Sequence, residues 1–263
     1  PVKLTVPLSG ILKADVATKF DMKSVETNQY ENMQNSGNMT LTGFRYVDDA
    51  KKVMNINKAI VQFTNTRINL QELDLTTGKT DMKVNGVLEN FYGFMFKNQE
   101  LKGNFNMNSN QFAVADFMSP EAPKTKTEKP KEAVKIPAFL NCSLTAKANT
   151  VLYDNLALKN VSGKLIIKDQ KVTLENVKSD IFGGQIGANG DVSTKGKIPV
   201  FNMNLNMKAV DIQQTFTQLE MMKKIAPIAG VINGKLNTTI KLSGNLDAKE
   251  MTPDVNSLSG DLV

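Results

Sequence analysis

Hydrophobic and polar residues alternate along most of this chain, and the segment VFNMNLNMKAV, residues 200–210, shows the pattern most clearly. Its large apolar side chains share one parity, and these are Phe201, Met203, Leu205 and Met207. The other parity carries asparagines and a lysine. Because successive side chains of an extended strand point to opposite faces, this period of two predicts a strand with one apolar and one amide-rich face.

Most other periodic segments also have a period of two, and Gly and Asn residues separate them. The segment GKLIIKDQKVTLENV predicts a hairpin that turns at Asp169-Gln170. Further turns are predicted at Asn85-Gly86, Asn189-Gly190 and Asn233-Gly234. The glycine-rich segment FGGQIGANG, residues 182–190, lacks the spacing of a phosphate-binding loop, and no helix begins after it. It is interpreted as a glycine bulge or tight bend between strands.

One segment has a helical period instead. Asp211 is a candidate N-cap, with Gln214 three residues later. Apolar residues then recur at helical spacing, namely Ile212, Phe216, Leu219, Met222 and Ile225. The spacing predicts one principal amphipathic helix over residues 211–225, which ends before Pro227. We expect this helix to pack on the sheet, and the alternative is a helix that lies on a membrane surface.

A stretch rich in Pro, Lys, Glu and Thr divides the chain, since residues 119–137 show no apolar period. It predicts a linker or long loop between a first β-repeat region, residues 1–118, and a second, residues 138–263. The two regions resemble each other, because Ile68–Gly86 aligns without gaps on Val172–Gly190. One β unit is therefore expected to occur more than once. The alternation is cut off at both ends of the sequence, so a fragment of a longer protein is expected.

The amino-acid composition excludes several classes of catalytic and binding site. The 263 residues carry a formal net charge of +6, but the basic residues are spread along the chain and Trp is absent, which does not fit a nucleic-acid-binding surface. The absence of His excludes the usual catalytic triads, and a single cysteine excludes thiolate zinc clusters within the chain. Carboxylates are scattered, so we predict no enzyme, no cofactor and no metal site. Cys142 shares its parity with Leu140 and Leu144 and is expected to be a small buried hydrophobe.

Three consecutive segments resemble the C-terminal region of AsmA-like envelope proteins. They are ENVKSDIFGGQIGANGDVST, PVFNMNLNMKAVDIQQTFTQL and IAPIAGVINGKLNTTIKLSGNLDAKEMTPDVNSLSGDL. The first region fits through INLQELDLTTGKTDMKVNGVLENF and ELKGNFNMNSNQF, although it has Thr77-Gly78 where the later copy has Phe182-Gly183-Gly184. The resemblance covers nearly the whole chain outside the linker, and the order of the elements carries its specificity.

The resemblance implies a non-enzymatic protein in the periplasm of a Gram-negative envelope, whose parent chain is anchored in the inner membrane by an N-terminal helix absent here. The wider group, with its TamB-like relatives, consists of bridge-type lipid carriers with long curled β-sheets and a hydrophobic concave face. Their proposed role is phospholipid movement between the membranes and support of outer-membrane biogenesis. The family offers no catalytic residues.

Together these observations predict a mostly β fold, in which repeated antiparallel strands form a curved, groove-like or half-barrel sheet with one principal amphipathic helix. The first functional hypothesis is a groove that binds or conducts phospholipid. Its candidate lipid-facing wall is Phe201, Met203, Leu205, Met207, Leu140 and Leu144, and its candidate groove-end helix carries Ile212, Phe216, Leu219, Met222 and Ile225. The alternative is a closed β-sandwich or barrel that serves as an adhesion or assembly scaffold of the envelope. A period of two fits both, because each has one buried face.

Overall fold

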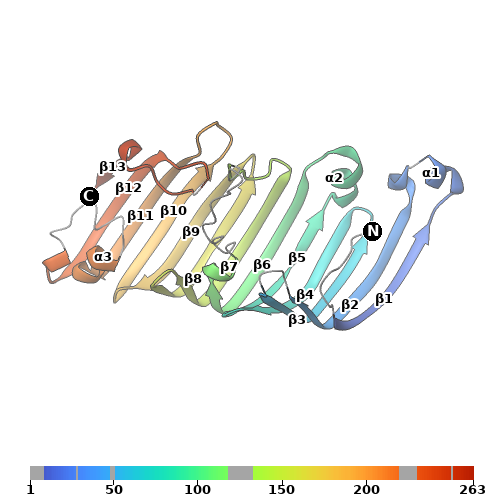
Figure 1. Ribbon diagram of the computed structural model, residues 1–263, viewed down its shortest axis with the longest axis horizontal. Coiled ribbons are helices and arrows are strands. Elements are labelled where there is room, and N and C mark those ends of the chain that lie inside the picture. Colours follow the sequence, from blue (N-terminus) through green and yellow to red (C-terminus); the bar gives the residue numbers. More distant parts are fainter. Residues whose placement is uncertain (1–8, 28, 48–50, 118–132, 219–229, 250) are drawn as a thin grey trace, which may run out of the picture.

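A computed structural model of the chain describes residues 9–27, 29–47, 51–117, 133–218, 230–249 and 251–263. Its strands form one sheet of 13 strands, arranged in space in their sequence order (Figure 1). In the first half, the elements are β1 (Ser9–Lys19), α1 (Met22–Glu26), η1 (Tyr30–Asn32), β2 (Gln34–Val47), β3 (Val53–Thr64), β4 (Arg67–Thr77), β5 (Thr80–Glu89), α2 (Phe91–Lys97), β6 (Leu101–Ala113) and η2 (Val114–Asp116). In the second half, they are β7 (Leu140–Tyr153), β8 (Leu156–Lys168), β9 (Lys171–Ile181), β10 (Gly184–Ser193), β11 (Val200–Asp211), α3 (Ile212–Gln218), β12 (Lys235–Asn245), η4 (Val255–Ser257) and β13 (Ser259–Leu262).

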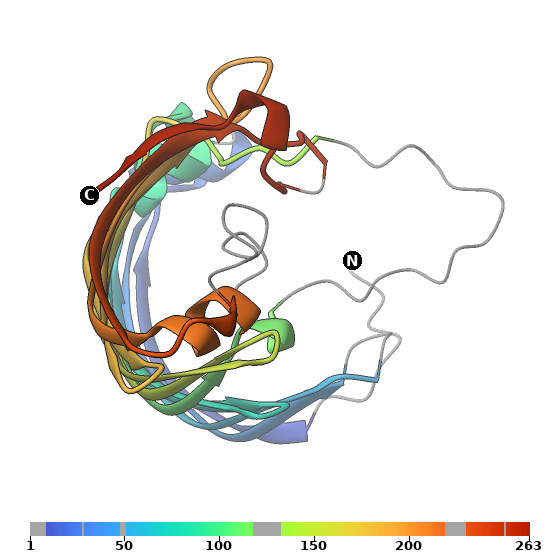
Figure 2. The same cartoon turned by 90° about the vertical axis from the view of Figure 1, so that its left-hand side faces the viewer.

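The sheet is curled into an open arc, which Figure 2 shows along the axis that runs from strand to strand. The first and last strands, β1 and β13, lie at opposite ends of the strand order and do not pair with each other. The sheet is therefore a half-barrel trough and not a closed barrel. The predicted fold class, a mostly β protein with a curved, groove-like sheet, is confirmed. We call the long edge that carries α1 and α2 the upper rim and the edge that carries α3 the lower rim (Figure 1).

The described strands pair antiparallel with one exception, because β6 and β7 run parallel. Parallel neighbours need a connection that returns along the strand length. Here β6 ends at Ala113 on the lower rim and β7 begins at Leu140 on the upper rim. The predicted linker, residues 119–137, falls in this connection, and residues 118–132 lie outside the described residues. The strands on both sides of it belong to the same sheet.

The internal repeat predicted from the sequence is a structural one. Residues 68–86 and 172–190 each form the body of a hairpin, β4–β5 and β9–β10, and each hairpin has a register shift at the corresponding place. Leu70 pairs with Gly86 and Leu73 with Val84 in the first copy; Leu174 pairs with Gly190 and Val177 with Ala188 in the second. Both copies therefore present the corresponding positions of the repeat to the same face of the sheet.

Two of the predicted tight turns are confirmed. Asp169 and Gln170, with φ of 53° and 59°, connect β8 to β9. Phe182 and Gly183, with φ of 51° and 65°, connect β9 to β10 in the same way. Two consecutive residues with positive φ match the turn whose twist suits a hairpin. Asn233-Gly234 also lies, as predicted, in the connection before β12.

The turns predicted at Asn85-Gly86 and Asn189-Gly190 are wrong, since both pairs lie inside strands, β5 and β10. The glycines make room for the backbone and a side chain of the neighbouring strand, since a Cβ atom would lie 2.3 Å from the carbonyl oxygen of Asn104 at Gly86 and of Asn202 at Gly190. A Cβ atom at Gly86 would lie 2.5 Å from Cδ1 of Phe105, and one at Gly190 would lie 2.4 Å from Sδ of Met203. Glycine inside a strand often marks such a close approach, which the sequence alone does not distinguish from a turn.

The turn between β8 and β9 gives a stability prediction. Replacing Asp169 and Gln170 together by Asn and Gly should raise the unfolding free energy by about 0.5–1 kcal/mol, because Gly adopts positive φ without steric cost. Urea unfolding followed by circular dichroism measures the change. As a control, Gln185→Gly inside β10 should lower stability by a similar amount. Equal effects of both changes would show that the backbone of the turn is not the cause.

The beginning of the predicted helix is confirmed. Asp211 caps α3, since the backbone N–H of Gln214 donates to its Oδ1 at 2.8 Å. Phe216 is buried, and Ile212 packs beside the same cluster. Leu219, Met222 and Ile225, the predicted continuation, lie outside the described residues.

Candidate functional site

An unbroken row of apolar residues and glycines crosses all 13 strands of the sheet. Each member is the direct cross-strand partner of the next, so all point to the same face. From β1 to β13 this central row is Ala14, Met39, Val61, Leu70, Gly86, Phe105, Leu144, Leu165, Leu174, Gly190, Met203, Leu242 and Gly260. No member carries a polar side chain.

Two further rows of the same kind flank the central row. The upper row lies nearer to the upper rim and runs through Val16, Gly37, Phe63, Ile68, Leu88, Gly103, Cys142, Ile167, Val172, Val192, Phe201 and Gly244. The lower row includes Leu41, Leu73, Met107, Ala146 and Leu205. We call the three rows together the apolar strip. At a strand spacing of about 4.8 Å, the strip is roughly 60 Å long.

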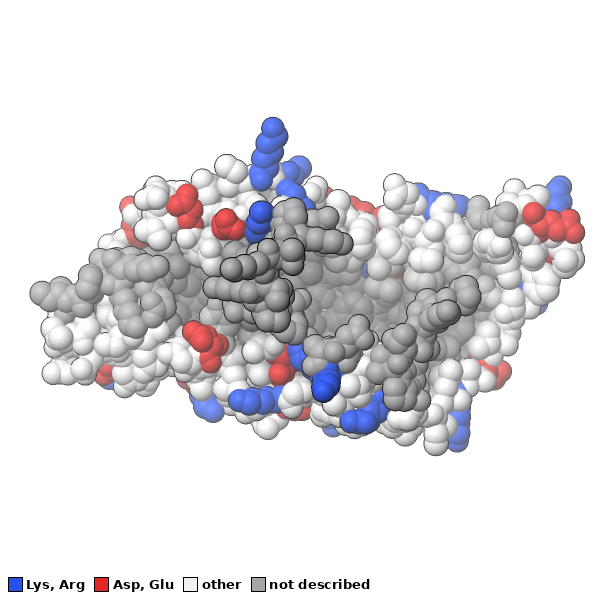
Figure 3. Space-filling view, in the orientation of Figure 1, with Lys and Arg blue, Asp and Glu red and all other residues white. Residues whose placement is uncertain are grey.

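The apolar strip faces the concave side of the trough. The helix α3 lies inside the arc in Figure 2, where Phe216 packs on Met207 and Ile240. Met207 shares the parity of Met203 and Leu205 in β11, so these side chains point into the arc as well. Figure 3 looks into this concave side, and the charged side chains visible there lie mostly toward the two long rims.

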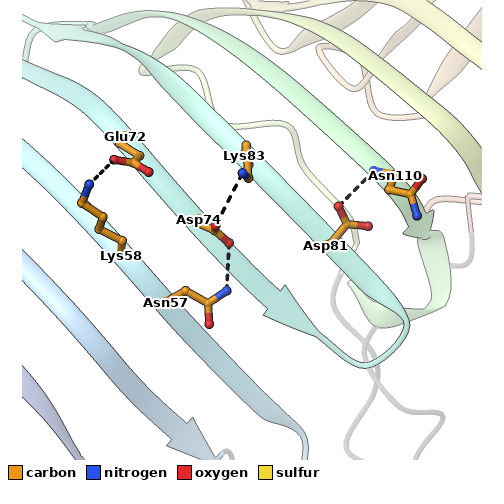
Figure 4. Close-up of polar contacts among 7 residues, drawn as sticks. All are labelled: Asn57, Lys58, Glu72, Asp74, Asp81, Lys83 and Asn110. Carbon is orange, nitrogen blue, oxygen red and sulfur yellow. Dashed lines mark hydrogen bonds and ion pairs between the residues drawn. The ribbon is translucent and has the colours of Figure 1, made fainter.

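The convex face is polar. Its side chains alternate with those of the apolar strip and form hydrogen bonds and ion pairs between neighbouring strands, some of which Figure 4 shows. Lys58 Nζ lies 2.8 Å from Glu72 Oε2, Asn57 Nδ2 donates to Asp74 Oδ1 at 2.9 Å, Lys83 Nζ lies 3.8 Å from Asp74 Oδ2, and the backbone N–H of Asn110 donates to Asp81 Oδ2 at 3.0 Å. Exposed ion pairs add little stability. These pairs identify the convex face as the solvent-exposed face of the sheet.

The predicted wall residues differ in accessibility. Met203, Leu205, Leu140 and Leu144 are half-buried on the concave face. Phe201 and Met207 are 5% and 2% exposed and are not free to contact a ligand. Met207 belongs, with Val210, Phe216 and Ile240, to the small core under α3. This core closes the sheet locally at the last strands, and the half-buried residues form the open part of the trough.

The largest part of the strip was not identified from the sequence. Phe105, Leu165, Leu174 and Leu242 lie in the central row between or beside the predicted residues. Each belongs to a segment with a period of two, which gives its parity within one strand. The missing information is the register between strands, because only the pairing shows that separate parities merge into one continuous face.

Cys142 lies in the upper row between Gly103 and Ile167 and is half-buried. It is less buried than the sequence predicted, since the concave face has no second sheet over it among the described residues. Burial raises the pKa of its thiol above the ordinary value. Its Sγ lies 3.7 Å from the carbonyl oxygen of Leu101. The only thiol of the chain therefore reports on the wall of the trough.

The raised pKa predicts how this thiol reacts with iodoacetamide. The thiolate is the nucleophile, so Cys142 in the folded protein should be alkylated more slowly than an ordinary cysteine, and its rate should level off only at a higher pH than that of an ordinary cysteine. The same protein in urea should reach its plateau at lower pH. Mass spectrometry of the alkylated protein measures both profiles. Identical profiles in the folded and unfolded protein would contradict the raised pKa.

Within the described ranges, no three His, Cys, Asp or Glu side chains gather as metal ligands. No helix in that part of the chain is long and apolar enough to cross a membrane. No family model, no curated protein and no solved structure matches this chain. The apolar strip is thus the candidate functional site on its geometry alone.

Proposed function

We propose that this chain binds or conducts phospholipid along its trough, without catalysing a reaction. The observation that carries the proposal is the central row, which crosses the whole sheet on the concave side without a polar side chain. Most proteins leave no apolar area of this size exposed. Where one is exposed, it usually marks a binding site. The half-buried state of Met203 and Leu144 leaves room for a ligand.

Acyl chains suit this surface. Each buried CH₂ group contributes about 0.8 kcal/mol, so a chain lying along the strip binds without a dedicated polar partner. The headgroup then faces the open side of the arc, where water reaches it. Glycines in the rows shape the floor, since a Cβ atom at Gly86 or Gly190 would collide with Phe105 or Met203 of the neighbouring strand.

The resemblance to AsmA-like proteins supplies the proposed setting. In that setting the chain lies in the periplasm of a Gram-negative envelope, its parent is anchored in the inner membrane, and it supports outer-membrane biogenesis. The alternative, a closed envelope scaffold without lipid, needs a second apolar face against the strip. None of the described residues outside α3 and its core supplies one for the half-buried part of the strip.

The lone cysteine tests the proposal. Palmitoyl lysophosphatidylcholine should slow the alkylation of Cys142 by about tenfold, because a chain on the upper row shields the thiol. Glycerophosphocholine, which has the headgroup alone, should give no protection. The matched control is the Cys142→Ser, Thr145→Cys variant, whose thiol lies on the convex face and should stay unprotected. Unchanged alkylation of Cys142 by the lysolipid would refute binding in the trough.

A further inference from the structure

The upper rim carries exposed apolar side chains that are separate from the apolar strip. They come from the end of β1, from α1, η1 and α2, and from the residue before β7. This rim patch consists of Phe20 (57% exposed), Met22 (61%), Tyr30 (40%), Met95 (53%), Phe96 (41%) and Phe139 (43%). Side chains of this size are exposed singly on many proteins, so their arrangement decides whether they form a site.

Aromatic contacts hold three members of the rim patch, Tyr30, Phe96 and Phe139, in place. The ring of Phe96 lies 6.2 Å from that of Tyr30 and 5.3 Å from that of Tyr92, which fixes α2 against η1. Tyr92 is itself hydrogen-bonded through its hydroxyl to the side chain of Asn35. On its other side, α2 places Phe94 4.9 Å from Phe139. The patch is thus one ordered surface built from several segments.

The rim patch is continuous with the trough. The backbone N–H of Leu101 donates to the carbonyl oxygen of Phe139 at 2.8 Å. Leu101 and Leu140 pair directly, and Leu140 shares the concave parity of Cys142. An apolar path therefore runs from the upper row, through Leu140 and Phe139, to Phe94 and the exposed end of α2.

Charge around the rim patch is nearly balanced. In the sequence, the charged residues near its members are of both signs: Lys19, Lys23 and Lys97 are basic, and Asp21, Glu26, Glu31 and Glu100 are acidic. A surface of this kind offers no net attraction to nucleic acid or to strongly anionic headgroups. Binding at the patch would have to come from burial of its aromatic and methionine side chains.

We propose that the rim patch inserts into the interfacial region of a lipid bilayer, where it brings the bilayer to the upper rim of the trough. Aromatic side chains with a polar end, together with Met and Phe, suit the boundary between headgroups and acyl chains. The continuity of the patch with a face that fits acyl chains favours a bilayer over a protein partner. The choice of a bilayer as the partner, and the further step in which a lipid passes over this rim into the trough, rest on the proposed function; the exposure of the patch does not.

The experiment is flotation with phosphatidylcholine vesicles. The wild-type protein should float with the vesicles, and the Met22→Asp, Met95→Asp variant should lose about tenfold in apparent affinity. These two side chains make none of the ring contacts described above, so the variant should melt like the wild type. The control carries the same added charge on the lower rim, Tyr153→Asp with Val231→Asp (53% and 77% exposed in the wild type), and should still float. Raising the salt concentration should change wild-type binding by less than about twofold.

Four results would overturn the bilayer contact, and each is distinct. A wild-type protein that stays with the soluble fraction, or a patch variant that floats unchanged, removes the bilayer contact. Binding that disappears in high salt shows an electrostatic surface instead. A wild-type dimer that the patch variant dissociates, measured by light scattering, assigns the patch to a second copy. Native mass spectrometry tests the trough separately. Lipid absent from the wild type refutes the proposed function, whereas lipid retained by a variant that no longer floats shows that the trough binds lipid without the patch.

Discussion

Leu144→Asp is expected to abolish the co-purification of lipid that we propose for the wild type, while the protein stays folded. Leu144 lies in the middle of the central row, between Phe105 and Leu165, and is half-buried. A carboxylate there disrupts the apolar strip for acyl chains, but it can still be hydrated from the open side of the trough. Native mass spectrometry should show at least a tenfold loss of bound lipid, and the unfolding free energy should fall by only about 1–2 kcal/mol.

The matched control is Thr145→Asp, one residue along the same strand but on the exposed convex face. It adds the same charge and should change neither lipid content nor stability beyond about 0.5 kcal/mol. Two results would count against the trough. If Leu144→Asp unfolds the protein, its side chain belongs to a closed core, where an unpaired charge costs several kcal/mol. If Leu144→Asp keeps its lipid, the lipid is bound elsewhere.

Phe216→Ala should lower the unfolding free energy of the last strands by about 3–5 kcal/mol. Phe216 is 7% exposed and completes the core that α3 forms with Met207, Val210 and Ile240. The described part of α3, Ile212–Gln218, has little helix stability of its own, so its packing holds it in place. Urea unfolding gives the free energy, and hydrogen exchange of the β11 and β12 amides shows whether the loss is local.

Gln213→Ala is the control for this change, because Gln213 is exposed on the same helix and Ala is at least as good a helix former. Its effect should stay within about 0.5 kcal/mol. A loss below about 1 kcal/mol for Phe216→Ala would mean that α3 is not a structural part of the trough, since burial of a whole ring would then have contributed almost nothing.

The sequence predicts the strands well because a period of two records which side chains share a face. It predicts the type of face at Met203 and Leu144, the hairpin at Asp169-Gln170 and the start of α3 for the same local reasons. It does not predict the extent of the apolar strip, because the pattern within one strand does not show which residues of the neighbouring strand pair with it, and the thirteen strands align only through that pairing. The turns predicted at Gly86 and Gly190 are wrong, because an Asn-Gly pair in the sequence does not show whether the glycine lies in a turn or beside a large residue of the neighbouring strand.

The parallel contact between β6 and β7 has a consequence for how the chain folds. Every other strand pair is antiparallel, so its first contact closes only the connection between the two strands, of which the longest is residues 212–234 between β11 and β12. The sheet can then grow strand by strand, as in a one-dimensional array of repeats. The parallel β6–β7 pair requires a longer closure, because its partners, such as Leu101 and Leu140, are separated by a whole strand as well as by residues 114–139, and this costs more chain entropy. Folding is therefore expected to proceed as two cooperative units that join last at this seam. The seam should then be the place where partial unfolding, mechanical or chemical, first divides the sheet.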